Sequence, residues 1–166
     1  MPLTPRDLQR LQGCHPDLIK VAQTASDLFA RSANPSQSFF ITEGMRTAEE
    51  EYNLWISCHN LDGTRNGQPW KTNCNGYPVG TTTPSGIPGT GESRHQHGHA
   101  FDYAILLNGV YVQGPLTVYQ QAADACLQAG AHLNIPVVYG GSWLAPKTDS
   151  DHIELSEASY PQAVTA

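Results

Sequence analysis

The chain has 166 residues, of which 39% are hydrophobic, and its formal net charge is −6 at pH 7. This length predicts one domain with a single buried core, and the acidic balance argues against a nucleic-acid-binding protein, whose charge would be basic and clustered. No stretch approaches about 18 consecutive apolar residues, so we expect no membrane insertion. The first residues lack the basic start and apolar core of a signal peptide, so we expect synthesis in a cytosol without a secretion signal.

The first part of the chain predicts one helix and one strand. The helix begins at Pro16, because a proline in the first turn costs no hydrogen bond and Asp17 suits the positive end of the helix dipole. Apolar residues recur at helical spacing over residues 18–29. A β-rich run follows at residues 39–43, and Gly44 ends it.

A second helix is predicted after Thr47, because Glu50 stands three residues later and completes a capping box. Its inner face would hold three apolar side chains, Tyr52, Trp55 and Ile56.

Residues 58–92 form a long segment rich in glycine and proline, without the periodicity of a helix or strand. Such a loop in a compact domain is either functional or a tolerated surface insertion. The four cysteines include no C-x-x-C pair, which favours buried or free thiols. A bridge between Cys58 and Cys74 would brace the loop, but it needs an oxidising compartment that the sequence does not announce.

The second half of the chain alternates short strands with one helix. The strands are predicted at residues 100–107, 110–112, 136–139 and 152–155. Asn108-Gly109 is a strong hairpin signal between the first two, and a helix is predicted over residues 116–133. Without repeated βαβ units, the fold class is α+β, with a central antiparallel β-sheet packed against about three α-helices.

A cluster of three histidines, His95, His97 and His99, is followed by Asp102. Imidazole and carboxylate together suit a divalent metal, and zinc above all. Side chains seven residues apart on a straight strand point to opposite faces, so His95 and Asp102 share a metal only if the chain turns between them. Gly98 is the residue at which we expect that turn.

A catalytic zinc site takes three protein ligands and leaves the fourth position to water. The best candidate for the third ligand is His152, which heads the last predicted strand and has carboxylates on both sides. Glu154 shares its strand face and either orients the His152 ring or is a solvated strand residue. We expect Trp143 to lie in the core or in the wall of a cleft.

Four segments resemble motifs of one enzyme group, in the same order from about residue 16 to residue 155. Residues 93–102 resemble the S-x-H-x-x-G-x-A-x-D motif of the zinc D-Ala-D-Ala carboxypeptidases and dipeptidases and of phage L-alanyl-D-glutamate endopeptidases. Residues 149–155 resemble the second motif, with a carboxylate three residues before a histidine ligand. Residues 44–47 resemble G-x-R-[ST], and residues 139–143 resemble G-G-D-W with Ser142 in place of the usual aspartate.

The resemblance implies a small α+β fold of the hedgehog/DD-peptidase type that holds one Zn²⁺. The implied zinc ligands are His95, Asp102 and His152. Asp149 resembles the general base that takes a proton from water and passes it to the leaving amine; Asp151 is a rival with a less suitable spacing.

Arg46 resembles the polar anchor near the scissile carbonyl or a substrate carboxylate, and Ser93 resembles a hydrogen-bonding group at the same site. His97 is expected to tune the site or contact substrate.

The resemblance implies a peptidoglycan stem peptide as substrate. We expect residues 1–166 to be a single catalytic domain with a core of about residues 16–155, monomeric and without a separate wall-binding domain. Such a chain fits a phage endolysin that a separate pore releases to the cell wall, where it cleaves the L-alanyl-D-glutamate bond. Two alternatives stay open: a D-Ala-D-Ala carboxypeptidase or dipeptidase, and a zinc-containing wall-binding domain without turnover.

Overall fold

The computed structural model describes residues 2–32, 34–47, 49–51, 53, 93–112, 114–144 and 148–161. Three predictions lie outside these residues: the inner face of the second helix, the loop at residues 58–92 and the Cys58–Cys74 pair. Of the other two cysteines, both Cys14 and Cys126 are buried and free, as the sequence predicts.

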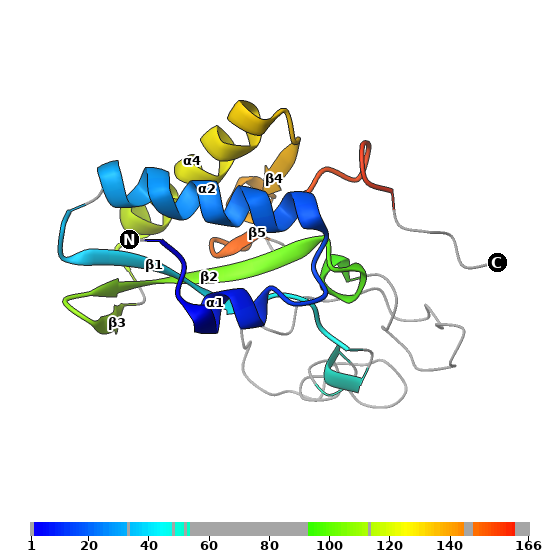
Figure 1. Ribbon diagram of the computed structural model, residues 1–166, viewed down its shortest axis with the longest axis horizontal. Coiled ribbons are helices and arrows are strands. Elements are labelled where there is room, and N and C mark those ends of the chain that lie inside the picture. The colour runs from blue at the N-terminus through cyan, green and yellow to red at the C-terminus, as the bar shows by residue number, and fades with distance from the viewer. Residues whose placement is uncertain are drawn as a thin grey trace.

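One antiparallel sheet forms the centre of the molecule (Figure 1). Its strands among the described residues are β1 (Gln37–Glu43), β2 (Ala100–Leu107), β3 (Val110–Val112), β4 (Val137–Tyr139) and β5 (His152–Leu155). The order is β1-β2-β5-β4, with β3 paired to β2 through the hairpin, and all pairs are antiparallel. The predicted α+β class and central antiparallel sheet are confirmed.

Two long helices, α2 (Pro16–Ser32) and α4 (Leu116–Leu133), lie against each other over one face of this sheet (Figure 1). Side chains alternate along β2, so Phe101, Tyr103 and Ile105 enter the core while Asp102 faces the other way. Each fully buried large apolar side chain contributes about 1.5–3 kcal/mol. The helix-covered face therefore stabilises the fold, and the opposite face is left for polar chemistry.

A short helix, α1 (Pro5–Arg10), was not predicted from the sequence. Thr4 caps it and forms a capping box with Asp7. The Asp7 carboxylate also accepts the Ile41 N–H of β1 at 2.9 Å, and Arg10 donates to the Ile41 carbonyl. Gly44 directly follows β1 and lies against the end of α1. A Cβ at Gly44 would lie 2.2 Å from the Arg10 carbonyl oxygen, so only glycine fits at this position. Helix α1 thus fixes the end of β1.

The helix predicted after Thr47 begins with the expected capping box. The Glu50 carboxylate accepts the Thr47 N–H and hydroxyl, both at 2.8 Å, and the Glu50 N–H donates to the Thr47 hydroxyl at 3.2 Å. Residues 49–51 and 53 are helical. No helix in the described parts of the chain is long and apolar enough to cross a membrane.

Candidate metal centre

A turn between η1 and β2 brings His95 back toward Asp102. His95 lies in the 3-10 helix η1 (Arg94–His97), and Gly98 ends it in the left-handed conformation, with φ 65°. A Cβ at Gly98 would also lie 2.4 Å from the Gly13 carbonyl oxygen, so both the backbone angle and the space require glycine. The chain therefore turns at the residue that the sequence indicates.

The pairing of β2 with β5 supplies the rest of the site. Asp102 lies directly opposite His152 in the antiparallel register, so the two side chains share the face that is turned away from the core.

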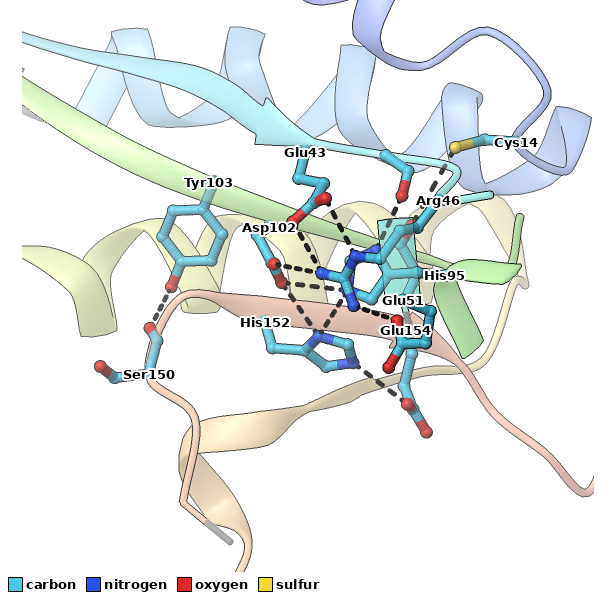
Figure 2. Close-up of polar contacts among 12 residues, drawn as sticks. Cys14, Glu43, Arg46, Glu51, His95, Asp102, Tyr103, Ser150, His152 and Glu154 are labelled. Atoms are coloured by element: carbon cyan, nitrogen blue, oxygen red, sulfur yellow. Dashed lines mark hydrogen bonds and ion pairs between the residues drawn. The ribbon is translucent and has the colours of Figure 1, made fainter. Parts of the chain in front are cut away.

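Three side chains converge at one point (Figure 2). Asp102 Oδ1 lies 3.0 Å from His152 Nδ1 and 3.3 Å from His95 Nε2, and the two nitrogens lie 3.3 Å apart. Ligand atoms of a tetrahedral zinc with bonds of about 2.0–2.1 Å lie about 3.3 Å apart. Within the described ranges this is the one group of metal-ligating side chains close enough for a shared ion. The donor set and its spacing fit zinc.

The second ring nitrogen of each histidine is held by a neighbour. His95 Nδ1 lies 2.7 Å from the Gly44 carbonyl oxygen, and His152 Nε2 lies 3.1 Å from Glu154 Oε2. A ring N–H that donates to such an acceptor leaves the other nitrogen free to bind a metal. Glu154 is therefore placed to orient the His152 ring, which was one of the two roles open to it.

The electrostatic interaction between Asp102 and the two histidines favours an ionised Asp102. Burial alone would raise the pKa of Asp102, but the attraction of His95 and the hydrogen bond of His152 lower it. Burial alone would lower the pKa of His152, but its hydrogen bonds to Asp102 and Glu154 raise it to about 10. A metal at this site must therefore displace a proton from His152.

Arg46 lies beside the three side chains, surrounded by carboxylates (Figure 2). Its Nε and Nη2 donate to the two oxygens of Glu43 at 2.9 and 2.7 Å, and its Nη1 donates to Glu51 at 2.6 Å. Nη2 also lies 3.8 Å from Asp102 Oδ2. Burial alone would lower the pKa of Arg46, but Glu43 and Glu51 raise it above its usual value. The guanidinium is thus charged and held in place.

Asp149 lies beside the 3-10 helix η2 (Gly140–Ser142), and Asp151 directly precedes His152 in the chain. A Cβ at Gly140 would lie 3.0 Å from the His152 Cβ and 3.1 Å from the Asp149 Cβ, so Asp149 and His152 flank this glycine together. Burial and a hydrogen bond to Asp149 raise the pKa of Asp151, with the negative charge of Asp102 adding to the shift. The Asp151 carboxyl group therefore binds a proton more readily than an ordinary aspartate does.

The remaining predicted residues do not belong to the metal-ligating group. The Trp143 ring lies 5.1 Å from the His152 ring and forms a wall beside it. The centroid of the His97 ring lies 6.3 Å from that of His99. Ser93 is fully buried, and its hydroxyl has no hydrogen-bond partner among the described residues.

Sequence reasoning missed Glu43, Glu51 and the Gly44 carbonyl. Four acidic residues lie within five positions of Arg46, namely Glu43, Glu49, Glu50 and Glu51. Acidic residues near an arginine are common on solvated surfaces, and the sequence does not indicate which of the four contact Arg46. At the position where the related motif has aspartate, the Ser142 hydroxyl donates to the Tyr139 carbonyl at 2.6 Å and closes the local turn.

No family model matches the chain, and no curated protein matches it in sequence. A crystal structure of the Serratia marcescens L-Ala D-Glu endopeptidase ChiX is similar, with a TM-score of 0.64 and 26% identity over 95% of this chain and 92% of that chain. A zinc complex of a mutant vancomycin resistance D,D-pentapeptidase VanY has 17% identity and a TM-score of 0.49 over 86% of this chain and 72% of that chain. The chain therefore shares its fold, over nearly its whole length, with an L-Ala D-Glu endopeptidase.

Proposed function

We propose that the protein is a zinc-dependent peptidoglycan hydrolase that cleaves the L-alanyl-D-glutamate bond of the stem peptide. The observation that carries this proposal is the group of His95, Asp102 and His152, whose ligand atoms lie 3.0 to 3.3 Å apart. The fold shared with ChiX supports the choice of bond, because ChiX is an L-Ala D-Glu endopeptidase. The phage origin and the release through a separate pore stay predictions from the sequence.

The three ligands would hold one zinc ion and leave a position open for water and substrate. Bound zinc would lower the pKa of a zinc-bound water to about 7 and would polarise the scissile carbonyl.

The chain's own residues would manage the proton. Asp149, which flanks His152 across Gly140, would take a proton from the attacking water and pass it to the leaving amine. Such a positioned carboxylate typically contributes roughly 10²- to 10⁴-fold in rate. Asp151 shares a hydrogen bond with Asp149 and would hold the Asp149 carboxyl group in place.

One further residue would shape the substrate site. Trp143 packs beside His152 and would form a wall for the peptide. Ser93 is fully buried, so its expected contact with substrate stays a prediction from the sequence. Arg46 was expected to contact substrate, but Glu43 and Glu51 already accept hydrogen bonds from its guanidinium.

The test of the proposed bond is mass spectrometry of muropeptides after digestion of purified sacculi. We expect new D-glutamate amino termini and no free D-alanine. Free D-alanine without new D-glutamate amino termini would identify a D-Ala-D-Ala carboxypeptidase instead. Zinc-loaded protein that sediments with sacculi and releases no peptide would identify a wall-binding domain.

A further inference from the structure

Arg46 is surrounded by carboxylates that already use most of its hydrogen-bonding capacity. Glu43 accepts two parallel hydrogen bonds, from Nε at 2.9 Å and from Nη2 at 2.7 Å, and Glu51 accepts a third, from Nη1 at 2.6 Å. The paired geometry with Glu43 is the one in which arginine binds a carboxylate most strongly. A substrate carboxylate could form the same paired hydrogen bonds with Arg46 only by displacing Glu43.

The remaining contact of the guanidinium leads to a predicted metal ligand. Asp102 turns Oδ1 toward His95 and His152, at 3.3 and 3.0 Å, and Oδ2 lies 3.8 Å from Arg46 Nη2. One oxygen therefore faces the metal position and the other faces a fixed positive charge. This division favours binding of a metal through one oxygen of Asp102.

The sheet builds this arrangement into the backbone. Glu43 lies opposite Asp102 in the pairing of β1 with β2, after a register shift between Ile41 and Glu43. Asp102 in turn lies opposite His152 in the pairing of β2 with β5. Glu43, Asp102 and His152 thus form a row across three strands, and Arg46 connects the first two members.

Glu51 approaches the guanidinium from the helix that follows Thr47. Its side chain is 5% exposed, against 38% for Glu43, and a carboxylate is buried to this extent only when it is paired. Among the described residues, the Glu51 carboxylate pairs with Arg46. The Arg46–Glu51 ion pair is therefore part of the protein interior.

We propose that Arg46 is a positioning residue for Asp102, that Glu51 and Glu43 hold it in place, and that it acts on metal affinity and not on substrate binding. The inference rests on the proposed function only in that Asp102 binds the metal. It requires neither a particular peptide bond nor turnover.

The test compares the variants Arg46→Lys and Glu51→Gln with wild type and with Glu50→Gln as a matched control. Lysine keeps the charge of Arg46 but cannot make the paired hydrogen bonds. Glu50→Gln removes the same charge as Glu51→Gln, from an exposed residue that bonds Thr47, and glutamine also completes a capping box. Zinc affinity is measured by competition with a chromophoric chelator, and the visible spectrum of the cobalt-loaded protein reports the coordination of Asp102.

We expect zinc affinity to fall about 10- to 100-fold in Arg46→Lys and Glu51→Gln, as is usual when a partner of a metal ligand is lost. It should stay within about twofold in Glu50→Gln, and the cobalt spectrum should change in Arg46→Lys, which a loss of stability alone would not produce. At saturating zinc, KM for muropeptide should equal that of wild type. Unchanged zinc affinity with a raised KM would overturn the proposal and return Arg46 to the substrate.

Different results would contradict the proposed function and the proposed role of Arg46. If wild-type protein binds zinc but releases no peptide, the proposed function is wrong, and the zinc affinities still decide the role of Arg46. If Arg46→Lys fails to fold, Glu51→Gln provides the same comparison with the arginine in place.

Discussion

His152 has a carboxylate at each ring nitrogen: Asp102 Oδ1 at 3.0 Å from Nδ1 and Glu154 Oε2 at 3.1 Å from Nε2. The first nitrogen faces the metal position and the second faces away from it. At the scale of single residues, the site thus depends on groups that never touch a metal, because they decide which nitrogen carries the proton.

Replacement of Glu154 by alanine should therefore weaken zinc binding by about 10- to 100-fold, because the His152 ring loses the acceptor that orients it. Isothermal titration calorimetry measures this directly. Glu157→Ala removes an exposed carboxylate three residues away and should leave the affinity unchanged. Equal affinities for both variants would show that Glu154 is only a solvated strand residue.

Replacement of Asp149 by asparagine should lower kcat by roughly 10²- to 10⁴-fold and leave zinc affinity unchanged, because a general base acts on the proton and not on the metal. Stopped assays of muropeptide release at saturating zinc give kcat. The companion variant Asp151→Asn should have a smaller effect. Loss of activity in Asp151→Asn with activity retained in Asp149→Asn would assign the base to Asp151.

At the scale of elements, local patterns predicted most of the fold. The strands at residues 100–107, 110–112 and 152–155 and the helix at residues 116–133 have the predicted bounds. Alternation and helical periodicity are strong over such lengths, and the hairpin signal fixed the β2–β3 register. Helix α1 has six residues, too few for a periodic pattern. Apart from the local Thr4–Asp7 capping box, it is stabilised by contacts with β1 that no local pattern contains.

In the site, too, some residues are predicted by a sequence motif and others depend on contacts between separate elements. A motif predicted that His95, Asp102 and His152 belong together, and the structure brings them together. Glu43 and Glu51 could not be found in this way, because their relation to Arg46 depends on the register shift in β1 and on how the following helix enters the site.

The turn at Gly98 should be sensitive to a single methyl group. In Gly98→Ala the added Cβ would meet the Gly13 carbonyl oxygen at 2.4 Å, at a residue whose φ is 65°. Gly109→Ala is the matched control, because φ is 78° there and no atom lies within 4 Å of the added Cβ. We expect Gly109→Ala to lower the free energy of unfolding by about 1–2 kcal/mol and Gly98→Ala to lower it by more. Denaturant unfolding of the metal-free proteins measures both, and equal losses would mean that the close approach at Gly98 is unimportant.

At the scale of the whole molecule, the sheet separates stability from chemistry. Helices α2 and α4 cover one face with the hydrophobic core (Figure 1). The opposite face carries Asp102, His152 and Glu154 on the neighbouring strands β2 and β5. His95 reaches this face from η1, which precedes β2, and Arg46 reaches it from the segment that follows β1. Changes on the polar face are therefore expected to affect metal binding and turnover more than folding. The fold is shared with ChiX over 95% of this chain.

The most direct test of the central claim is zinc titration of EDTA-treated protein with purified sacculi, while new D-glutamate amino termini are counted. We expect no release of peptide without metal, and an activity that rises in proportion to added zinc and levels off at one ion per chain. Release that persists in EDTA, or zinc-loaded protein that produces no D-glutamate amino termini, would contradict the central claim.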